Sequence, residues 1–345
     1  MRKGKFASRS LASASLFLFL PSFLLLAVRT GNLRDYIVAG SVLAGILVFP
    51  LLCSAFGCDR LSGSLGLAVS LMCLLLLQAV DPSRVLPQSI FLGLSLGAFF
   101  LFSWLSAQFP SRLSVGCFAG LLGLGCLALP RLSSGMPEGL ESLGLPFLVL
   151  AVSCLLAARK RLAAIALGFV GCAGILLNMQ IPVFRELAAV PQQSPYSALS
   201  ALAEGRLFGT GLGLGTIVPD AGTSAAASVP VFSLLCEQLG AIAACCLMVI
   251  YAVLALRGVH IAACARNRFH GLAAMGAVLL MSLRALAAAA EALGLVSLGS
   301  LPFPLLSTGP LPLAADWALL GIVSGAWQVH AQDLEEDTRL AMLAR

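Results

Sequence analysis

The chain has 345 residues, of which 59% are hydrophobic and only 10% are charged, and its mean hydropathy is +1.00. A soluble domain carries about 25% charged residues, so this composition excludes an ordinary soluble protein and indicates a polytopic membrane protein. The formal net charge is +6, but in such a chain basic residues report orientation in the bilayer, and they give no support for nucleic-acid binding.

Apolar runs long enough to cross a bilayer recur along the whole sequence. A hydrocarbon core about 30 Å thick needs roughly 20 apolar residues per helix. We therefore predict an all-α polytopic membrane protein that forms a single integral membrane domain over residues 1–345, with about ten transmembrane helices. The predicted spans are 11–28, 36–56, 63–80, 86–109, 113–129, 143–158, 162–181, 229–256, 272–295 and 314–330.

The first apolar run has two interpretations. Arg2, Lys3, Lys5 and Arg9 precede it, as basic residues precede the apolar part of a secretory signal peptide. The run is long, however, and residues 24–29 lack a small-x-small cleavage site. We therefore interpret it as the first transmembrane helix.

The basic residues predict the orientation of the chain. With the amino terminus inside, fourteen basic residues fall on the cytoplasmic side and six on the outer side, and Arg284 remains within a helix. This asymmetry follows the positive-inside rule. Both termini are then predicted to be cytoplasmic, residues 332–345 form a short polar cytoplasmic tail, and residues 182–228 form a large extracytoplasmic loop between the seventh and eighth helices.

This loop is the one long polar interruption in the chain, and loops of its length are usually functional or disordered. Its glycines allow either a flexible hinge or a close backbone approach to a ligand such as a phosphate. The segment does not follow a strand, which excludes a dinucleotide-binding fingerprint. The glycines are Gly205, Gly209, Gly211, Gly213 and Gly215.

The ninth predicted helix contains two charged residues, Arg284 and Glu291. A charge within the bilayer costs about 2.5 to 3.5 kcal/mol on insertion scales, so each needs a compensating role. Seven positions apart, they lie on one helix face about 10 Å apart, which favours partners on neighbouring helices. Three interpretations remain: an internal polar clamp, a polar cavity for a charged substrate, or a proton relay.

A proline-rich segment, 299–312, follows this helix. Pro302, Pro304, Pro310 and Pro312 disfavour a regular helix there. Non-helical backbone at membrane depth is tolerated only against protein or a watery cavity. We predict that this segment lines the mouth of a cavity.

Cysteine and histidine suggest no metal or disulfide chemistry on the outer side. The predicted topology places none of the 11 cysteines in an outward loop, which favours small packing residues within helices. His260, His270 and His330 all fall at cytoplasmic helix ends, so no outward zinc or histidine-base site is expected.

Five sequence blocks in the second half share order and spacing with a known family. YSALSALAEGRLFGTGLG at 196–213 is similar to YQ-S-x-x-AIGSGGLFGKGLG, VPDA at 218–221 to LPEA, and CEQLG at 236–240 to AEELG. RGVHIAACARNRF at 257–269 is similar to RGLxIAxxARDRF, and LGLVSLGSLPFPLLSTG at 293–309 to LGLLPVTGLPLPFISYGG. Over about a third of its length the chain therefore resembles the SEDS family of cell-wall proteins, the group of FtsW, RodA and SpoVE.

The resemblance implies a multi-pass protein of the cytoplasmic membrane that polymerises lipid II into glycan strands on the outer face. It also implies a class B penicillin-binding protein as the partner, with lipid II or a similar polyprenyl-diphosphate saccharide and membrane lipid as ligands. It brings no certain cofactor, and the sequence gives no support for a divalent cation.

The family's catalytic aspartate is not matched, because its position falls on Ser224 or Val229 according to the direction of alignment. The nearest outward acids, Asp220 and Glu204, are therefore the candidate catalytic residues. The resemblance and the membrane charges together give the candidate substrate-binding residues: Arg206, Gly209, Gly211, Gly213, Arg284, Glu291, Pro302, Pro304, Ser307 and Gly309.

Three functions fit these observations. The first is a divergent polymerase of cell division or elongation. The second is a non-catalytic scaffold or regulator of a transpeptidase, which the lost aspartate favours. The third is a flippase of lipid-linked saccharide. The retained glycines and the Leu-Pro-Phe-Pro turn favour saccharide binding, and they do not separate the polymerase from the flippase.

Overall fold

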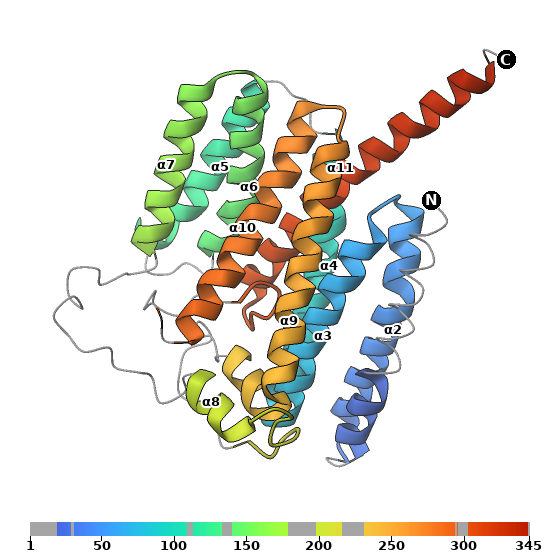
Figure 1. The fold of residues 1–345 in the computed structure, drawn as a ribbon, viewed down its shortest axis with the longest axis vertical. Coiled ribbons are helices and arrows are strands. Elements are labelled where there is room, and N and C mark those ends of the chain that lie inside the picture. Colours follow the sequence, from blue (N-terminus) through green and yellow to red (C-terminus); the bar gives the residue numbers. More distant parts are fainter. Residues whose placement is uncertain are drawn as a thin grey trace.

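The computed structural model describes residues 19–28, 31–108, 113–132, 140–178, 198–215, 231–293, 295 and 303–343, and these residues form helices without any strand. A first helix covers Phe19–Val28. The others, labelled in Figure 1, are α2 (Leu33–Ala55), α3 (Arg60–Val80), α4 (Pro82–Gln108), α5 (Leu113–Leu132), α6 (Leu140–Ala157), α7 (Arg161–Asn178), α8 (Ala198–Gly205), α9 (Val231–Cys264), α10 (Arg268–Ala292) and α11 (Pro310–Leu343).

The predicted all-α membrane fold is confirmed, since each of the ten predicted spans overlaps a helix in the part of the chain that the structure describes. Among the described residues, α2, α3, α4, α9 and α10 are long and apolar enough to cross a bilayer. The first helix and the apolar parts of α5, α6 and α7 are shorter; the latter cover Gly116–Leu129, Ser142–Ala157 and Arg161–Ala173.

Three helices differ from the prediction. The short helix α8 lies within the predicted outer loop, α9 continues to Cys264, and α11 begins at Pro310 and continues to Leu343. Residues 332–343, predicted as a polar tail, are therefore helical, because they consist mostly of good helix formers such as Leu, Ala, Glu and Gln. Figure 1 shows this part of α11 projecting from the bundle at the end opposite to α8.

Helices α4 and α11 pack closely because α11 carries small residues at the contact. A methyl group on Gly321 would lie 2.5 Å from the Phe99 carbonyl oxygen, and one on Gly325 would lie 2.5 Å from that of Ser103. Gly321 and Gly325 thus form a GxxxG motif, which lets two membrane helices approach at backbone distance. This contact fixes α11 in the bundle and, with it, the segment that precedes α11.

An ion pair ties three helices together at the end of the bundle away from α8. The Arg257 side chain on α9 donates two hydrogen bonds to Asp59, which precedes α3, at 2.9 and 3.2 Å. The Arg257 guanidinium also lies 4.7 Å from the centre of the Trp327 ring on α11. Asp59 is buried and accepts a hydrogen bond from Ser62 N, so it also caps α3.

Candidate functional site

Helix α9 is sharply bent at Gly240, whose backbone angles are φ 81° and ψ −179°. The Phe303 ring stacks on Phe232 at 5.0 Å and also contacts the Tyr251 ring at 5.3 Å. In a straight helix Phe232 and Tyr251 would be about 28 Å apart at 1.5 Å per residue. The first part of α9, residues 231–239, therefore folds back along the rest of the helix, and nearly all of it is buried.

The segment 206–215, which we call the α9 clamp, replaces the hydrogen bonds that the bend removes. The carbonyl oxygens of Glu237 and Gln238 accept bonds from Thr210 N at 2.9 Å and from Gly211 N at 3.1 Å. In return, Ala241 N donates to the Arg206 carbonyl at 3.0 Å and Ile242 N donates to that of Leu207 at 3.3 Å. The clamp thus supplies all four partners, and the bend leaves none of these groups unpaired.

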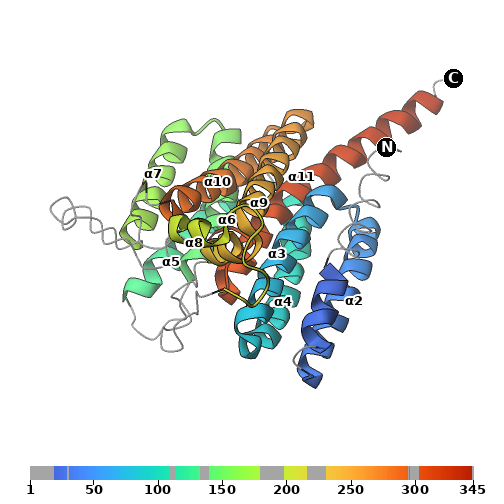
Figure 2. The same cartoon turned by 60° about the horizontal axis from the view of Figure 1, so that its bottom comes forward.

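Glycine is required where the clamp meets α9. Gly209 and Gly240 have φ of 80° and 81°, and a methyl group on Gly209 would lie 2.1 Å from the Gln238 carbonyl oxygen. Methyl groups on Gly205 and Gly215 would lie 2.4 Å from the Cys236 carbonyl oxygen and 2.5 Å from the Glu237 carboxylate. Glycine at these four positions therefore permits the close packing of this loop against α9. Figure 2 shows α8 and this loop at the end of the bundle, against α9.

Residues 303–309, which we call the re-entrant turn, are non-helical and lie inside the bundle. Tyr251 donates its hydroxyl to the Pro304 carbonyl, Ser70 of α3 to that of Leu305 at 3.3 Å, and Gln88 of α4 to that of Ser307 at 3.0 Å. Side chains from three helices therefore satisfy three carbonyl groups of this turn. This arrangement meets the condition for irregular backbone at membrane depth.

The partner of Arg284 is Asp316 on α11, a residue that the sequence analysis did not select. The Arg284 guanidinium donates to Asp316 Oδ1, and the backbone N–H of Leu305 donates to Asp316 Oδ2 at 2.8 Å. Asp316 is fully buried, and Leu305 has a φ of 63°, an unusual value for leucine. The pair therefore joins α10, α11 and the re-entrant turn. Of the three interpretations of Arg284, this arrangement corresponds to an internal polar contact between helices.

The candidate catalytic residue Glu204 and the candidate substrate-binding residue Arg206 are both exposed, at the junction of α8 and the α9 clamp. Glu291 is half-buried near the end of α10. Asp220, Ser224, Val229 and Pro302 lie outside the described residues.

The other candidate residues fall in the two segments already described. Gly209, Gly211 and Gly213 belong to the α9 clamp. In the re-entrant turn, Pro304 and Ser307 are buried and Gly309 is half-buried. Among the residues that the structure describes, the Ser307 hydroxyl and both amide atoms of Gln78 on α3 are buried and have no hydrogen-bond partner, so these groups can bond to a polar ligand or to water.

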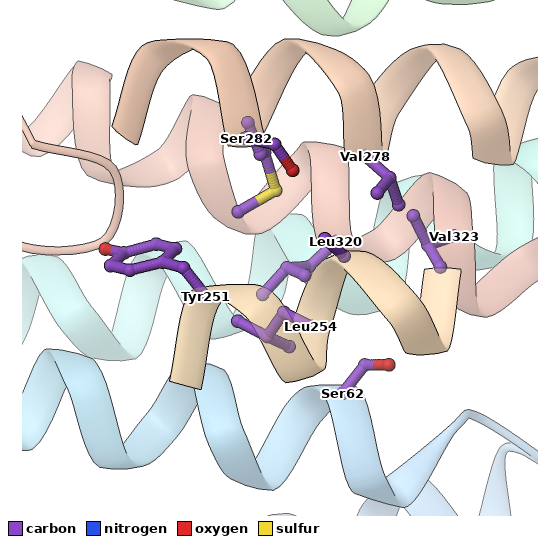
Figure 3. Close-up of a pocket in the computed structure, with 9 residues that line it drawn as sticks. Ser62, Tyr251, Leu254, Val278, Ser282, Leu320 and Val323 are labelled. Carbon is purple, nitrogen blue, oxygen red and sulfur yellow. The ribbon is translucent and has the colours of Figure 1, made fainter. Parts of the chain in front are cut away.

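A small cavity between α3, α9, α10 and α11 is not a saccharide site. Its volume is about 10 Å³, room for about one water molecule. Figure 3 shows it lined mainly by apolar side chains, with the Tyr251 hydroxyl pointing away toward the re-entrant turn. Among the described residues, no group of three or more His, Cys, Asp or Glu side chains is arranged to bind a metal.

Comparison with known proteins gives matches in the same region. A family model described as "cell cycle protein", for FtsW, RodA and SpoVE, matches residues 178–332. The peptidoglycan glycosyltransferase RodA of Mycobacterium leprae is 31% identical over 127 residues, which are 37% of this chain and 27% of that protein. The chain thus aligns with only about a quarter of that relative.

The fold is similar to that of a chain from a peptidoglycan synthase complex that coordinates polymerization and crosslinking. The two share 18% identity, the TM-score is 0.51, and the match covers 80% of this chain and 98% of the other. The rod shape determining protein RodA of Thermus thermophilus matches with 22% identity and a TM-score of 0.48 over 79% of this chain and 97% of the other.

Proposed function

We propose that this chain is a divergent member of the SEDS family of FtsW, RodA and SpoVE cell-cycle proteins, and that it polymerises a lipid-linked cell-wall saccharide such as lipid II. The reaction would take place on the outer face of the cytoplasmic membrane. The proposed partner is a class B penicillin-binding transpeptidase, since the structural match at TM-score 0.51 comes from a peptidoglycan synthase complex.

The observation that supports this proposal most is the meeting of three family-like segments on α9. The α9 clamp bonds to the backbone on both sides of Gly240, and the re-entrant turn packs on Phe232 and Tyr251. Segments up to about a hundred positions apart in the sequence are thus held against one bent helix. A glycosyl transfer needs such fixed positioning of donor and acceptor.

The proposed chemistry assigns roles to residues of this chain. Asp220 or Glu204 would act as the general base for the acceptor hydroxyl. Arg206, which is exposed, would contact the diphosphate of the lipid-linked sugar, because a guanidinium suits phosphate oxygens. Arg284 is engaged with Asp316, so we assign it to positioning the re-entrant turn instead of direct phosphate contact.

A polymerisation assay tests this proposal. Purified protein with lipid II, alone and with the co-expressed transpeptidase, should form glycan polymer. Asp220→Asn should reduce the rate at least 100-fold, in line with the contribution of a general base, whereas Asp337→Asn in the distant part of α11 should leave it unchanged. Polymer formation that survives both Asp220→Asn and Glu204→Gln would exclude these acids.

A non-catalytic scaffold is the second candidate, because neither Ser224 nor Val229 supplies a carboxylate. It predicts that the wild-type protein is inert, that Ser224→Asp or Val229→Asp gains polymerase activity, and that the transpeptidase still co-purifies. A flippase would instead move labelled lipid II across liposomes, and the absence of such movement would exclude that function.

A further inference from the structure

The lipid-facing surface of α9 begins at the bend. Past Gly240, the exposed apolar residues Ile242, Val249, Val253 and Leu256 recur at helical spacing along one face of the helix. In a membrane-embedded bundle, an apolar helix face that no other helix covers contacts the lipid tails.

The α9 clamp continues this apolar face. Ile242 N donates a hydrogen bond to the Leu207 carbonyl. Leu207 therefore lies next to Ile242, the first residue of the lipid-facing surface. The side chains of Leu207 and Phe208 are 61% and 82% exposed. Backbone hydrogen bonds at Leu207, Gly209, Thr210 and Gly211 fix this part of the loop, so two large apolar side chains are held outward by a fixed backbone.

The helices place the clamp at the edge of the hydrocarbon core. Helix α3 spans about 30 Å at 1.5 Å per residue, which equals the thickness of the core. Arg257 of α9 binds Asp59, which directly precedes α3. Gly240 lies about 26 Å from Arg257 along α9, so the clamp is level with the last turn of α3, where acyl chains meet headgroups.

We propose that the α9 clamp is an interfacial lipid anchor, in which Leu207 and Phe208 insert among the outermost parts of the acyl chains. Aromatic side chains are enriched at this depth. The neighbouring Arg206 is exposed and can reach lipid phosphates while its stem covers apolar surface. The anchor would hold α8 and the clamp against the bilayer.

Bromolipid quenching in proteoliposomes tests this proposal without any lipid II, so its outcome is separate from that of the proposed function. Phe208→Trp protein is reconstituted in phosphatidylcholine brominated either near the headgroup or near the bilayer centre, and wild-type emission from its three tryptophans is subtracted. Val253→Trp, in the middle of the lipid-facing surface, and Leu340→Trp, on the projecting part of α11, are the matched controls.

We expect shallow bromines to quench Phe208→Trp several-fold more than deep bromines, with little quenching by aqueous iodide. Val253→Trp should respond most to deep bromines, and Leu340→Trp should respond to iodide. Iodide quenching of Phe208→Trp equal to that of Leu340→Trp would overturn the proposal. Protection from both quenchers would also overturn it, since protein would then cover the clamp. Leu207→Trp provides a second reading of the same depth.

Discussion

The Asp316 carboxylate accepts two hydrogen bonds, one from the Arg284 guanidinium and one from the backbone N–H of Leu305. Each charge alone would be costly in the interior of a membrane bundle, and the pair removes that cost only while both partners are present. The carboxylate also holds Leu305 in a left-handed conformation that leucine rarely adopts. The pair therefore determines the shape of the re-entrant turn.

Removing one charge should be far more harmful than removing both. Asp316→Asn leaves a buried guanidinium without its counter-ion, and we expect a loss of about 3 to 5 kcal/mol of stability. In the double variant with Arg284→Gln, the two amides can still hydrogen-bond and the asparagine can still accept from Leu305 N, so most of the loss should be recovered. The measurement is the melting temperature of the purified protein in detergent.

The Arg266–Asp337 pair provides the matched control, because its side chains are 72% and 66% exposed. Arg266→Gln should leave the melting temperature unchanged, as most exposed ion pairs contribute little. If Asp316→Asn melts like the wild type, the pair does not support the turn.

At this scale the sequence predicts which residues are unusual better than it predicts their partners. Arg284 stands out because it is charged within an apolar run. One of its three interpretations, an internal polar contact, corresponds to the ion pair with Asp316 in the structure. Asp316 carried the same signal within the predicted span 314–330, and two opposite charges in adjacent predicted helices could have been paired. No spacing rule, however, predicts the bond from Asp316 to Leu305 N, which depends on the tertiary fold.

At the scale of elements, hydropathy predicts the helices and misses the bend in α9. The average hydropathy stays apolar through Gly240, because the first part of the helix is apolar on both sides of Glu237 and Gln238. The available signal was the glycine that follows these two polar residues. The prediction of a long loop at 182–228 did not identify α8, because eight residues are too few for a clear periodic pattern.

The bend and the clamp should depend on glycine at position 209. Gly209→Ala puts a methyl group 2.1 Å from a carbonyl oxygen in a left-handed conformation, and that conformation alone costs an L-residue about 1 to 2 kcal/mol. We expect amide hydrogen exchange at Thr210, Gly211, Ala241 and Ile242 to become about tenfold faster or more, because these four N–H groups donate the hydrogen bonds between the α9 clamp and α9.

The control for this variant is Gly45→Ala on α2, where a methyl group would meet nothing within 4 Å. It should leave exchange at the four amides unchanged. Unchanged exchange in Gly209→Ala as well would mean that the clamp tolerates a side chain and that the close approach to α9 is not essential.

At the scale of the whole molecule, the fold gives the charge pattern a geometry. Figure 1 shows the α2–α3, α6–α7 and α9–α10 connections at one end of the bundle, opposite to α8. The basic residues of these connections, among them Arg60, Lys160 and Arg268, therefore lie together at one end. That end is predicted to be cytoplasmic by the positive-inside rule, and α8 with the α9 clamp would then face outward.

Lysine labelling can test this orientation, because the chain has only three lysines, Lys3, Lys5 and Lys160, and all three are predicted to be cytoplasmic. A membrane-impermeant amine reagent applied to right-side-out spheroplasts should leave Lys160 unmodified, and lysis should expose it, as measured by mass spectrometry of the α6–α7 peptide. Leu214→Lys, in the exposed part of the clamp, should be modified before lysis. Modification of Lys160 in intact spheroplasts would reverse the orientation and place the proposed catalytic loop on the side where no extracytoplasmic transpeptidase domain could reach it.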